Sequence, residues 1–453
     1  MNNKLIFLLS VGITAICSSC VFDDLESPEP EEVYVKYYGS NGSQYLSDMV
    51  INDQANVVML GGQELSQAGA NWNCLLIEAD NVGNEINTVD IDVARDILGI
   101  AQVTGDSSVY ATEEVPESIK LIDGGYLIVG TFNQVIDGSP QESKIFWARL
   151  DQDFGIIIAD TIGAGTDNVT GKDIMQTNDG NIVVVGMTDH PEENDLTVNP
   201  ENQYFLIKKL LSNPDSTIWR KSYGYPSSND EVFACYELGD GSIAVLGSTE
   251  QLGDGGARGK NVGVMVVNSL ASSQTSDEIF GVEINGDNAS DDIPYDAIAI
   301  SGGFVVVGTS TLGEVIRPFV IGVRESGALI FNTPIDSRWG INAHGYGVVQ
   351  SNSGDLVVTG KYPEFSVAVG EAGYQGLIPE KQDEVMFIRT SETGIPKADF
   401  ENNFGLRSGD DIGEVVLKFP NGAIAIGATI DFGSNQNMIA LMKVNDQGSL
   451  QRQ

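Results

Sequence analysis

The feature that most constrains the fold is a repeat whose last copy lacks a segment that the chain supplies at its start. One internal copy contains Trp219-Arg220-Lys221-Ser222-Tyr223-Gly224, and residues 34–39 repeat the same pattern, aromatic-x-Lys-x-Tyr-Gly. The last copy stops at Gln453, where this string is due. Such an arrangement predicts a ring closed by strand exchange, because closure removes two open sheet edges. We therefore expect residues 32–39 to pair with residues 437–444.

The repeat is marked by a short apolar run that ends in glycine and recurs seven times. Neighbouring marker glycines lie 52 to 69 residues apart, a period too long for most solenoids. Six residues before the marker, five copies carry another glycine after Asp or Ser, which is typical of a hairpin turn. The equivalent residues in the other two copies are Ala55 and Asn421. The markers are Gly61, Gly130, Gly186, Gly247, Gly308, Gly360 and Gly427.

Each copy is interpreted as four strands, of which the marker run is the second. Runs this apolar indicate sheets that are buried on both faces, as stacked propeller blades are. The predicted fold class is all-β: a seven-bladed β-propeller of four-stranded blades over residues 33–453, closed by the N-terminal strand that completes the last blade.

The N-terminus predicts an export signal. Lys4 precedes an apolar stretch from Leu5 to Ile16, and small residues lead to Cys20. This is the layout of a secretory signal over residues 1–19 with a cleavage site. An ordinary signal peptide is the alternative to a lipoprotein signal in which Cys20 is lipidated. Residues 20–32 are acidic and contain proline, which favours a flexible tether.

The repeats resemble those of secreted and lipid-anchored seven-bladed propellers of Bacteroidota. The likeness rests on Gly124-Gly125-Tyr126, Leu206-Ile207-Lys208 and Trp219 to Gly224, and covers residues 33–453. The Asp23-Asp24 pair after Cys20 looks like the surface-export signal of lipoproteins in the same bacteria. The resemblance implies an outer-membrane protein, held by its lipid anchor and facing the cell exterior. It says almost nothing about activity.

The charge balance restricts the partners. Against 24 Lys and Arg stand 64 Asp and Glu, a net charge of −40. Nucleic acid is excluded as a partner, because phosphate binding needs a basic surface. The acidity either keeps the protein soluble or serves to bind calcium or a cationic partner.

Four copies carry an acidic pair 16 and 17 residues before the marker glycine. These positions precede the innermost strand, so the pairs should surround one mouth of the central channel, where they could bind calcium through oxygen. The alternative is that they accept hydrogen bonds from amides at a chain corner. The pairs are Glu113 and Glu114, Asp230 and Glu231, Asp291 and Asp292, and Asp410 and Asp411.

Long loops are expected on the same face, among them residues 362–383, and aromatic residues there could stack on sugars or contact a protein. Cys74 and Cys235 lie too far apart around a ring for a disulfide and are interpreted as buried thiols. The candidate aromatic contacts are Trp72, Tyr110, Phe132, Tyr362, Phe365 and Tyr374.

Two function classes remain open. With two histidines, no phosphate loop and no Cys-x-x-Cys, the sequence favours a non-enzymatic, monomeric binding module for a glycan or a partner protein. The alternative is a carbohydrate-active hydrolase or lyase that uses carboxylates at the channel mouth. A pocket that combines aromatic residues with two convergent carboxylates would favour the enzyme.

Overall fold

The computed structural model describes residues 33–39, 42–65, 72–97, 111–136, 139–163, 168–189, 202–224, 228–251, 257–268, 280–282, 291–312, 315–335, 342–369, 375–405, 409–433 and 436–445. The predicted signal, Cys20 and the acidic tether lie outside these residues. No helix within the described ranges is both long and apolar enough to cross a lipid bilayer.

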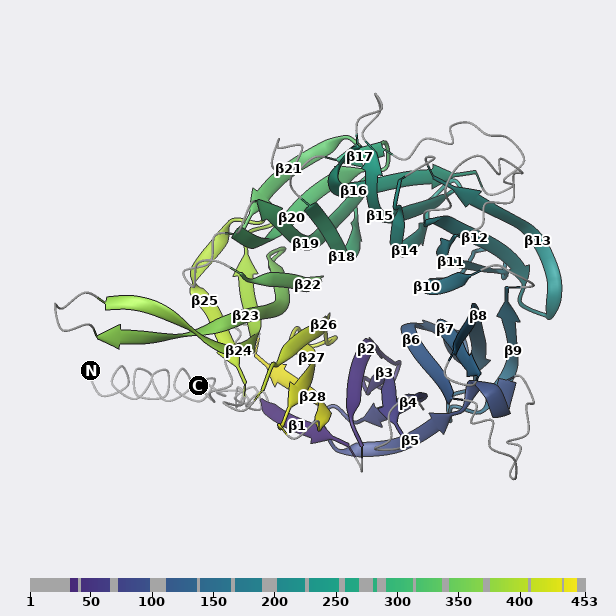
Figure 1. Ribbon diagram of the computed structural model, residues 1–453, viewed down its shortest axis with the longest axis horizontal. Helices are drawn as coiled ribbons and strands as arrows, with labels where there is room; N and C mark the ends of the chain where they lie inside the picture. The colour runs from purple at the N-terminus through teal and green to yellow at the C-terminus, as the bar shows by residue number, and fades with distance from the viewer. Residues whose placement is uncertain are drawn as a thin grey trace, which may run out of the picture.

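The described residues form sheets arranged around a central axis in an all-β, propeller-like fold (Figure 1). The innermost strands are β2 (Gln44–Ile51), β6 (Ala111–Ile122), β10 (Val169–Gln176), β14 (Glu231–Glu237), β18 (Asp291–Ile300), β22 (His344–Gln350) and β26 (Ile412–Lys418). The second strands are β3 (Val57–Glu64), β7 (Gly125–Ile136), β11 (Ile182–Thr188), β15 (Ile243–Gln251), β19 (Gly303–Leu312), β23 (Leu356–Val369) and β27 (Ile424–Asp431).

The third strands are β4 (Trp72–Ala79), β8 (Ser139–Leu150), β12 (Gln203–Leu210), β16 (Ala257–Val267), β20 (Val315–Arg324), β24 (Gln375–Thr390) and β28 (Asn437–Val444). The outer strands are β5 (Glu85–Ile91), β9 (Ile156–Ile162), β13 (Asn213–Tyr223), β17 (Phe280–Val282), β21 (Leu329–Pro334), β25 (Pro396–Phe404) and β1 (Tyr34–Tyr38). A short π-helix, η1 (Val93–Ile97), follows β5.

Hydrogen bonding groups these strands into five four-stranded sheets and one eight-stranded sheet. In the eight-stranded sheet, a single parallel pair between Trp72 and Glu113 links β4 to β6. The N-terminal strand β1 pairs antiparallel with β28, in the sheet order β1-β28-β27-β26. The predicted pairing of the first strand with residues 437–444 is therefore confirmed.

Apolar side chains fill the space between neighbouring sheets. The marker runs are almost fully buried, because both faces of each second strand lie against another sheet. One cluster joins Ile439 and Leu441 of β28 to Leu46 and Met59 of the first sheet, so the last sheet packs on the first. Cys74 and Cys235 are buried free thiols, as predicted.

The marker glycines lie opposite an irregularity in the innermost strands. Each innermost strand carries a β-bulge at the same place, next to the residue that pairs with the marker glycine. A Cβ at Gly186 would collide with the carbonyl oxygen of Thr170, and one at Gly360 with that of His344. Glycine therefore lets the two strands approach closely enough for the bulge to form.

One predicted loop is wrong. Residues 362–383 were expected to form a long loop after a second strand, but β23 continues to Val369 and β24 begins at Gln375. The two strands form a paired hairpin that projects beyond the ring (Figure 1). Both strands therefore extend well past the point where the apolar marker run ends.

Candidate functional site: the central channel

The bulges place one extra residue from each innermost strand in the channel. A bulge leaves one residue without a partner in the ladder, and that residue turns away from the sheet. The unpaired residues all line the same cavity in the centre of the ring, which has a volume of about 130 Å³. They are Ser47, Glu117, Lys172, Phe233, Tyr295, Tyr346 and Glu414.

The residue after the bulge is Asp in three of the innermost strands, and each of these carboxylates ties two sheets together. Asp48 accepts hydrogen bonds from its neighbour Met49 N at 2.8 Å and from Ile119 N of the next innermost strand at 2.9 Å. Asp173 and Asp296 repeat this geometry. Each accepts a hydrogen bond from the N–H group of the following residue and one from the next innermost strand, from Cys235 N and Val348 N respectively. These three carboxylates therefore have a structural task.

The two lysines of the cavity are already paired. Lys172 Nζ lies 2.5 Å from the Glu117 carboxylate, and Lys120 Nζ lies 3.1 Å from that of Asp173. Burial raises the pKa of Glu117, and the ammonium group of Lys172 opposes this shift. The ion pair therefore favours the ionised form of Glu117.

Three polar side chains in the cavity have no hydrogen-bond partner among the described residues: Glu414, Tyr295 and Tyr346. Tyr295, Tyr346 and Glu414 project from β18, β22 and β26, which are three consecutive innermost strands. Burial raises the pKa of Glu414 to about 7, and Lys361 opposes this shift. Burial also raises the pKa of Tyr295, so its hydroxyl group stays protonated. These groups are available to a ligand.

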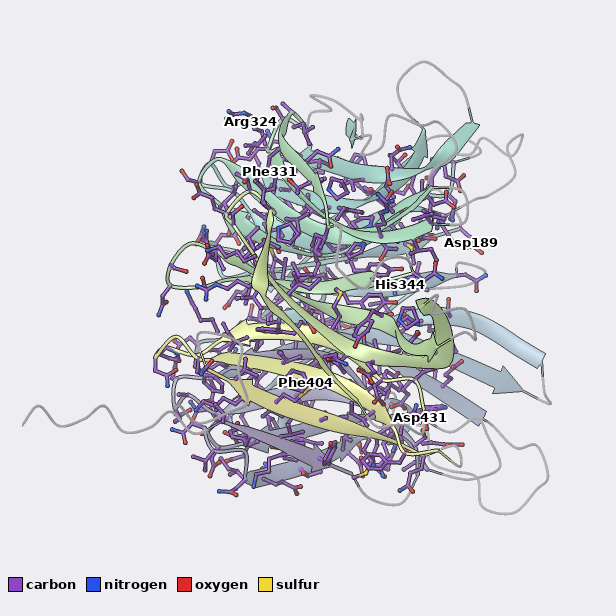
Figure 2. All side chains as sticks on the ribbon, turned by 90° about the vertical axis from the view of Figure 1, so that its left-hand side faces the viewer. Asp189, Arg324, Phe331, His344, Phe404 and Asp431 are labelled. Atoms are coloured by element: carbon purple, nitrogen blue, oxygen red, sulfur yellow. The ribbon has the colours of Figure 1, made fainter. Side chains whose placement is uncertain are left out.

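An aromatic series leads from the channel toward one face of the ring. The Tyr295 and Tyr346 ring centroids lie 4.8 Å apart, nearly perpendicular, and His344 stacks on Tyr346 at 5.8 Å. Figure 2 shows His344 toward the same face as Asp189 and Asp431, whereas Arg324 lies toward the opposite face. Burial and the nearby Lys361 lower the pKa of His344, which keeps its imidazole neutral. Aromatic faces of this kind can pack on sugar rings.

The predicted acidic pairs do lie at the N-terminal ends of four innermost strands, but one member of each pair is buried and bonded to the protein. Glu114 accepts Val93 N at 2.7 Å, and Asp411 accepts Asp431 N at 2.9 Å. Asp230 and Asp292 accept serine hydroxyl groups, from Ser228 and Ser310.

The other member of each pair is more accessible. Glu231 forms an ion pair with Lys260 at 2.7 Å, whereas Asp291 and Asp410 accept backbone N–H groups. Glu113 is exposed. No three His, Cys, Asp or Glu side chains within the described part of the chain lie together as a metal site. Calcium binding at these pairs stays a prediction.

The predicted aromatic contacts divide into three groups. Trp72 lies at the start of β4, with its ring centroid 5.2 Å from that of Tyr45. Tyr362 is buried between sheets, and its hydroxyl donates to Glu384 at 2.9 Å. Phe132 is buried as well. Tyr110, Tyr374 and the side chain of Phe365 lie outside the described part of the structure.

The residues that sequence reasoning missed are the bulged ones. Each lies 13 or 14 residues before its marker glycine, only two to four residues after the predicted acidic pair positions. The seven copies carry four polar and three aromatic residues at this position, which is no distinct signal in the sequence. The register of two strands decides which residue is bulged, and register appears only in the folded sheet.

No protein-family model matches the sequence, and no curated protein matches it. Solved structures do resemble the fold. A polysaccharide lyase, an ulvan lyase of a new family, has a TM-score of 0.55 at 10% identity, over 92% of this chain and 98% of that chain. The polysaccharide lyase Uly1 has a TM-score of 0.47 at 9% identity, over 90% and 91%.

The β-propeller domain of the Trilobed protease from Pyrococcus furiosus has a TM-score of 0.42 at 9% identity, over 91% of this chain and 98% of that chain. Identities this low say nothing about individual residues. The similarity with a TM-score above 0.5 supports the all-β, propeller-like fold described here.

Proposed function

We propose that this protein is a carbohydrate-active enzyme, a hydrolase or lyase that works in the central channel. The observation that carries the proposal is the cavity itself, where the carboxyl groups of Glu117 and Glu414 converge with the rings of Tyr295 and Tyr346. The structural likeness to polysaccharide lyases favours the same class. Together these observations support the enzyme better than the non-enzymatic binding module that the sequence favoured.

Two carboxyl groups with different environments suit acid and base roles. With a pKa of about 7, Glu414 is half protonated at neutral pH and would donate its proton to the oxygen of the leaving sugar. Glu117, paired with Lys172, would act as base or nucleophile on the other side of the bond. The hydroxyl groups of Tyr295 and Tyr346 would orient the sugar between them.

The proposal includes a closed ring of seven blades. The eight-stranded sheet would count as two four-stranded blades, because only the single Trp72–Glu113 pair joins its two halves. The remaining five sheets would supply one blade each. Pairing of β1 with β28 joins the two ends of the chain. Such a ring holds seven innermost strands around one axis and so brings seven bulged residues together.

The proposed cellular location is the outer membrane. Residues 1–19 would act as the lipoprotein signal, Cys20 would carry the lipid, and residues 20–32 would tether a monomeric propeller that faces the exterior. A surface enzyme of this kind would meet polysaccharides outside the cell. With a net charge of −40, the protein would repel the phosphates of nucleic acid, which is therefore not among the proposed partners.

The test is an activity screen with purified protein on neutral, amino-sugar and uronate polysaccharides. New reducing ends report cleavage of either kind, and absorbance of an unsaturated product reports lyase activity alone. We expect Glu414→Gln and Glu117→Gln each to lower the rate by about 100-fold or more. Glu392→Gln, an exposed turn residue between β24 and β25, is the control and should leave the rate unchanged. Glycan binding without any cleavage would return the protein to the class of binding modules.

A further inference from the structure

The charges around the channel cavity are strongly unequal. Among the described residues that line it, five carry carboxyl groups, two carry ammonium groups and none is an arginine. The acids are Asp48, Glu117, Asp173, Asp296 and Glu414, and the bases are Lys120 and Lys172. The excess of carboxyl groups would repel an anionic sugar and attract a cationic one.

The two lysines cannot serve a substrate carboxylate without leaving their partners. Lys172 is 2.5 Å from Glu117, and Lys120 bridges Asp173 at 3.1 Å and Asp48 at 4.0 Å. Elimination at a uronate withdraws a proton next to a carboxylate, which builds up further negative charge that a free cation must stabilise. Neither lysine among the described lining residues is free for this, so these residues do not suit a uronate.

The groups that remain free suit an ammonium ion. The carboxyl group of Glu414 has no hydrogen-bond partner among the described residues, and the hydroxyl groups of Tyr295 and Tyr346 have none either. An ammonium group donates charge-assisted hydrogen bonds, which are among the strongest that proteins make, and the carbonyl oxygen of a protonated carboxyl group can accept one. The partly exposed rings of Phe233, Tyr295 and Tyr346 add faces that attract a cation.

The size of the cavity limits what can enter. An apolar cavity of about 150 Å³ can hold one benzene molecule, so a volume of about 130 Å³ corresponds to a single six-membered ring. No more than one sugar unit can therefore occupy it. The rest of a polymer would lie outside the cavity, on the face to which the aromatic series leads.

We propose that the sugar bound in the channel carries a free ammonium group, as in a polysaccharide of deacetylated amino sugars, and that its bond is cleaved by hydrolysis. The inference rests on the proposed function for the site and names its substrate class. In the reaction, water adds across the glycosidic bond: the anomeric carbon receives hydroxyl, and the leaving oxygen receives a proton from Glu414. The ammonium group donates hydrogen bonds to the carbonyl oxygen of the Glu414 carboxyl group and to the tyrosine hydroxyl oxygens, so the Glu414 proton stays available to the leaving oxygen. The ammonium group itself takes no part in the bond changes.

The test measures binding by calorimetry at neutral pH with three tetrasaccharides: glucosamine, N-acetylglucosamine and galacturonate. We expect the glucosamine tetramer to bind at least 10-fold more tightly than either other tetramer. Glu414→Gln and, as a second variant, Tyr295→Phe should weaken its binding several-fold, with circular dichroism confirming the fold. Glu392→Gln should bind like the wild type. Raising the salt concentration from 0.05 to about 0.5 M should weaken binding, because screening reduces attraction between charges.

The outcomes separate this inference from the proposed function. If the protein cleaves a neutral or uronate polysaccharide and the glucosamine tetramer binds no better than the others, the substrate class is overturned and the enzyme class stands. If the glucosamine tetramer binds selectively through Glu414 and no polysaccharide is cleaved, the cation preference stands and the enzymatic function falls. Equal binding of glucosamine and N-acetylglucosamine, unaffected by Glu414→Gln, overturns the ammonium site.

Discussion

Single residues set both the turns and the channel wall. At the hairpin before the second strand, Gly124, Gly180, Gly241, Gly302 and Gly354 all have positive φ. The sequence predicted this turn from the glycines alone. In the first copy Ala55 takes the same conformation, with φ of 61°, although a side chain disfavours it. The surrounding turn imposes the conformation, through the Ala55 N–H bond to Asn52 O at 2.9 Å.

Exchanging the residues at two of these turns should have opposite effects. Ala55→Gly removes the side chain from a left-handed position and should stabilise the fold by up to about 1 kcal/mol. Gly124→Ala introduces the same strain, although nothing lies within 4 Å of the added Cβ, and should destabilise it by about 1 kcal/mol. Midpoints of urea unfolding would measure both. A loss of stability in the first variant with none in the second would contradict the assignment of strain to backbone conformation.

The carboxyl group of Glu414 should make stability depend on pH. Its pKa is raised to about 7 by burial, so the folded state binds its proton more tightly than the unfolded state does. Stability should therefore fall as the pH rises from about 5 to about 8. Lys361, Tyr295 and Tyr346 are the charged or titratable groups that interact with it.

Glu414→Gln should remove this part of the pH dependence. The melting temperature of the variant should equal that of the wild type near pH 5 and exceed it near pH 8. The Glu414 carboxyl group makes no hydrogen bond to the described residues, so its replacement by an amide removes none. Thermal melts of wild type, Glu414→Gln and the exposed control Glu392→Gln across this range would measure the difference. Parallel curves for all three proteins would place the pKa of Glu414 in its ordinary range.

Strands are the scale at which the sequence was most informative. Apolar runs, turn glycines and the repeated aromatic-x-Lys-x-Tyr-Gly string placed the second strands and predicted the β1–β28 pair correctly, because burial and turn geometry leave strong local patterns. The bulges leave no such pattern. Glu117 or Tyr295 looks like an ordinary outward residue until the register of two strands is known, and register is a property of the assembled sheet.

The acidic pairs show the same limit. Their place at the starts of innermost strands was predictable by counting, whereas the partners of Glu114 or Asp411 come from segments distant in sequence. Only the folded chain shows that these carboxylates are occupied by N–H groups.

Removal of β1 should destabilise the ring. The strand makes five residue pairs with β28, and Tyr38 is buried and donates to Gly83 O at 2.9 Å in the neighbouring sheet. A variant that begins at Ser40 should lose several kcal/mol, at about 1 kcal/mol for each lost hydrogen bond, and should aggregate through the edge of β28. Light scattering and thermal melting would measure both effects.

Two substitutions within β1 provide the matched comparison. Tyr38→Ala should lower the melting temperature strongly, and Tyr37→Ala, at a residue that is 44% exposed, only slightly. A truncated protein that stays monomeric and melts with the wild type would show that the pairing contributes nothing to stability.

At the scale of the whole molecule, the acidic surface and the N-terminal signal make predictions that can be tested separately. The net charge of −40 is spread over a protein in which most of the described acids at the channel mouth are bonded to backbone N–H groups, serine hydroxyl groups or lysine. Like charges in one compact structure repel one another, so any bound cation would relieve this repulsion.

Calcium should stabilise the protein if the acidic pairs bind it. At a hundredfold excess over Kd, a ligand of the folded state adds about 2.7 kcal/mol. Millimolar calcium should then raise the melting temperature relative to magnesium at matched ionic strength. Replacing the more accessible Glu113, Asp291 and Asp410 by their amides should abolish the rise. If calcium leaves the melting temperature of the wild type unchanged, these residues only accept hydrogen bonds from amides at a chain corner.

Cys20 should hold the protein at the membrane. Acyl chains contribute about 0.8 kcal/mol for each buried methylene, and two or more chains give stable anchoring. Cys20→Ser should therefore release a folded protein into the soluble fraction. Fractionation of cells, with a salt wash to remove electrostatic attachment, would measure the distribution. Retention of the variant in the washed membranes would contradict the lipid anchor.

The bulges have a consequence for how such a protein can change over generations. A substitution at Ser47 or Phe233 alters what the channel presents while the marker glycine, the ladder and the apolar layers between sheets keep their own residues. Recognition and foldability are thus subject to selection at different positions. Relatives that share this ring can be expected to keep the glycines and to differ at the seven bulged residues, so that a new specificity needs few mutations and little loss of stability.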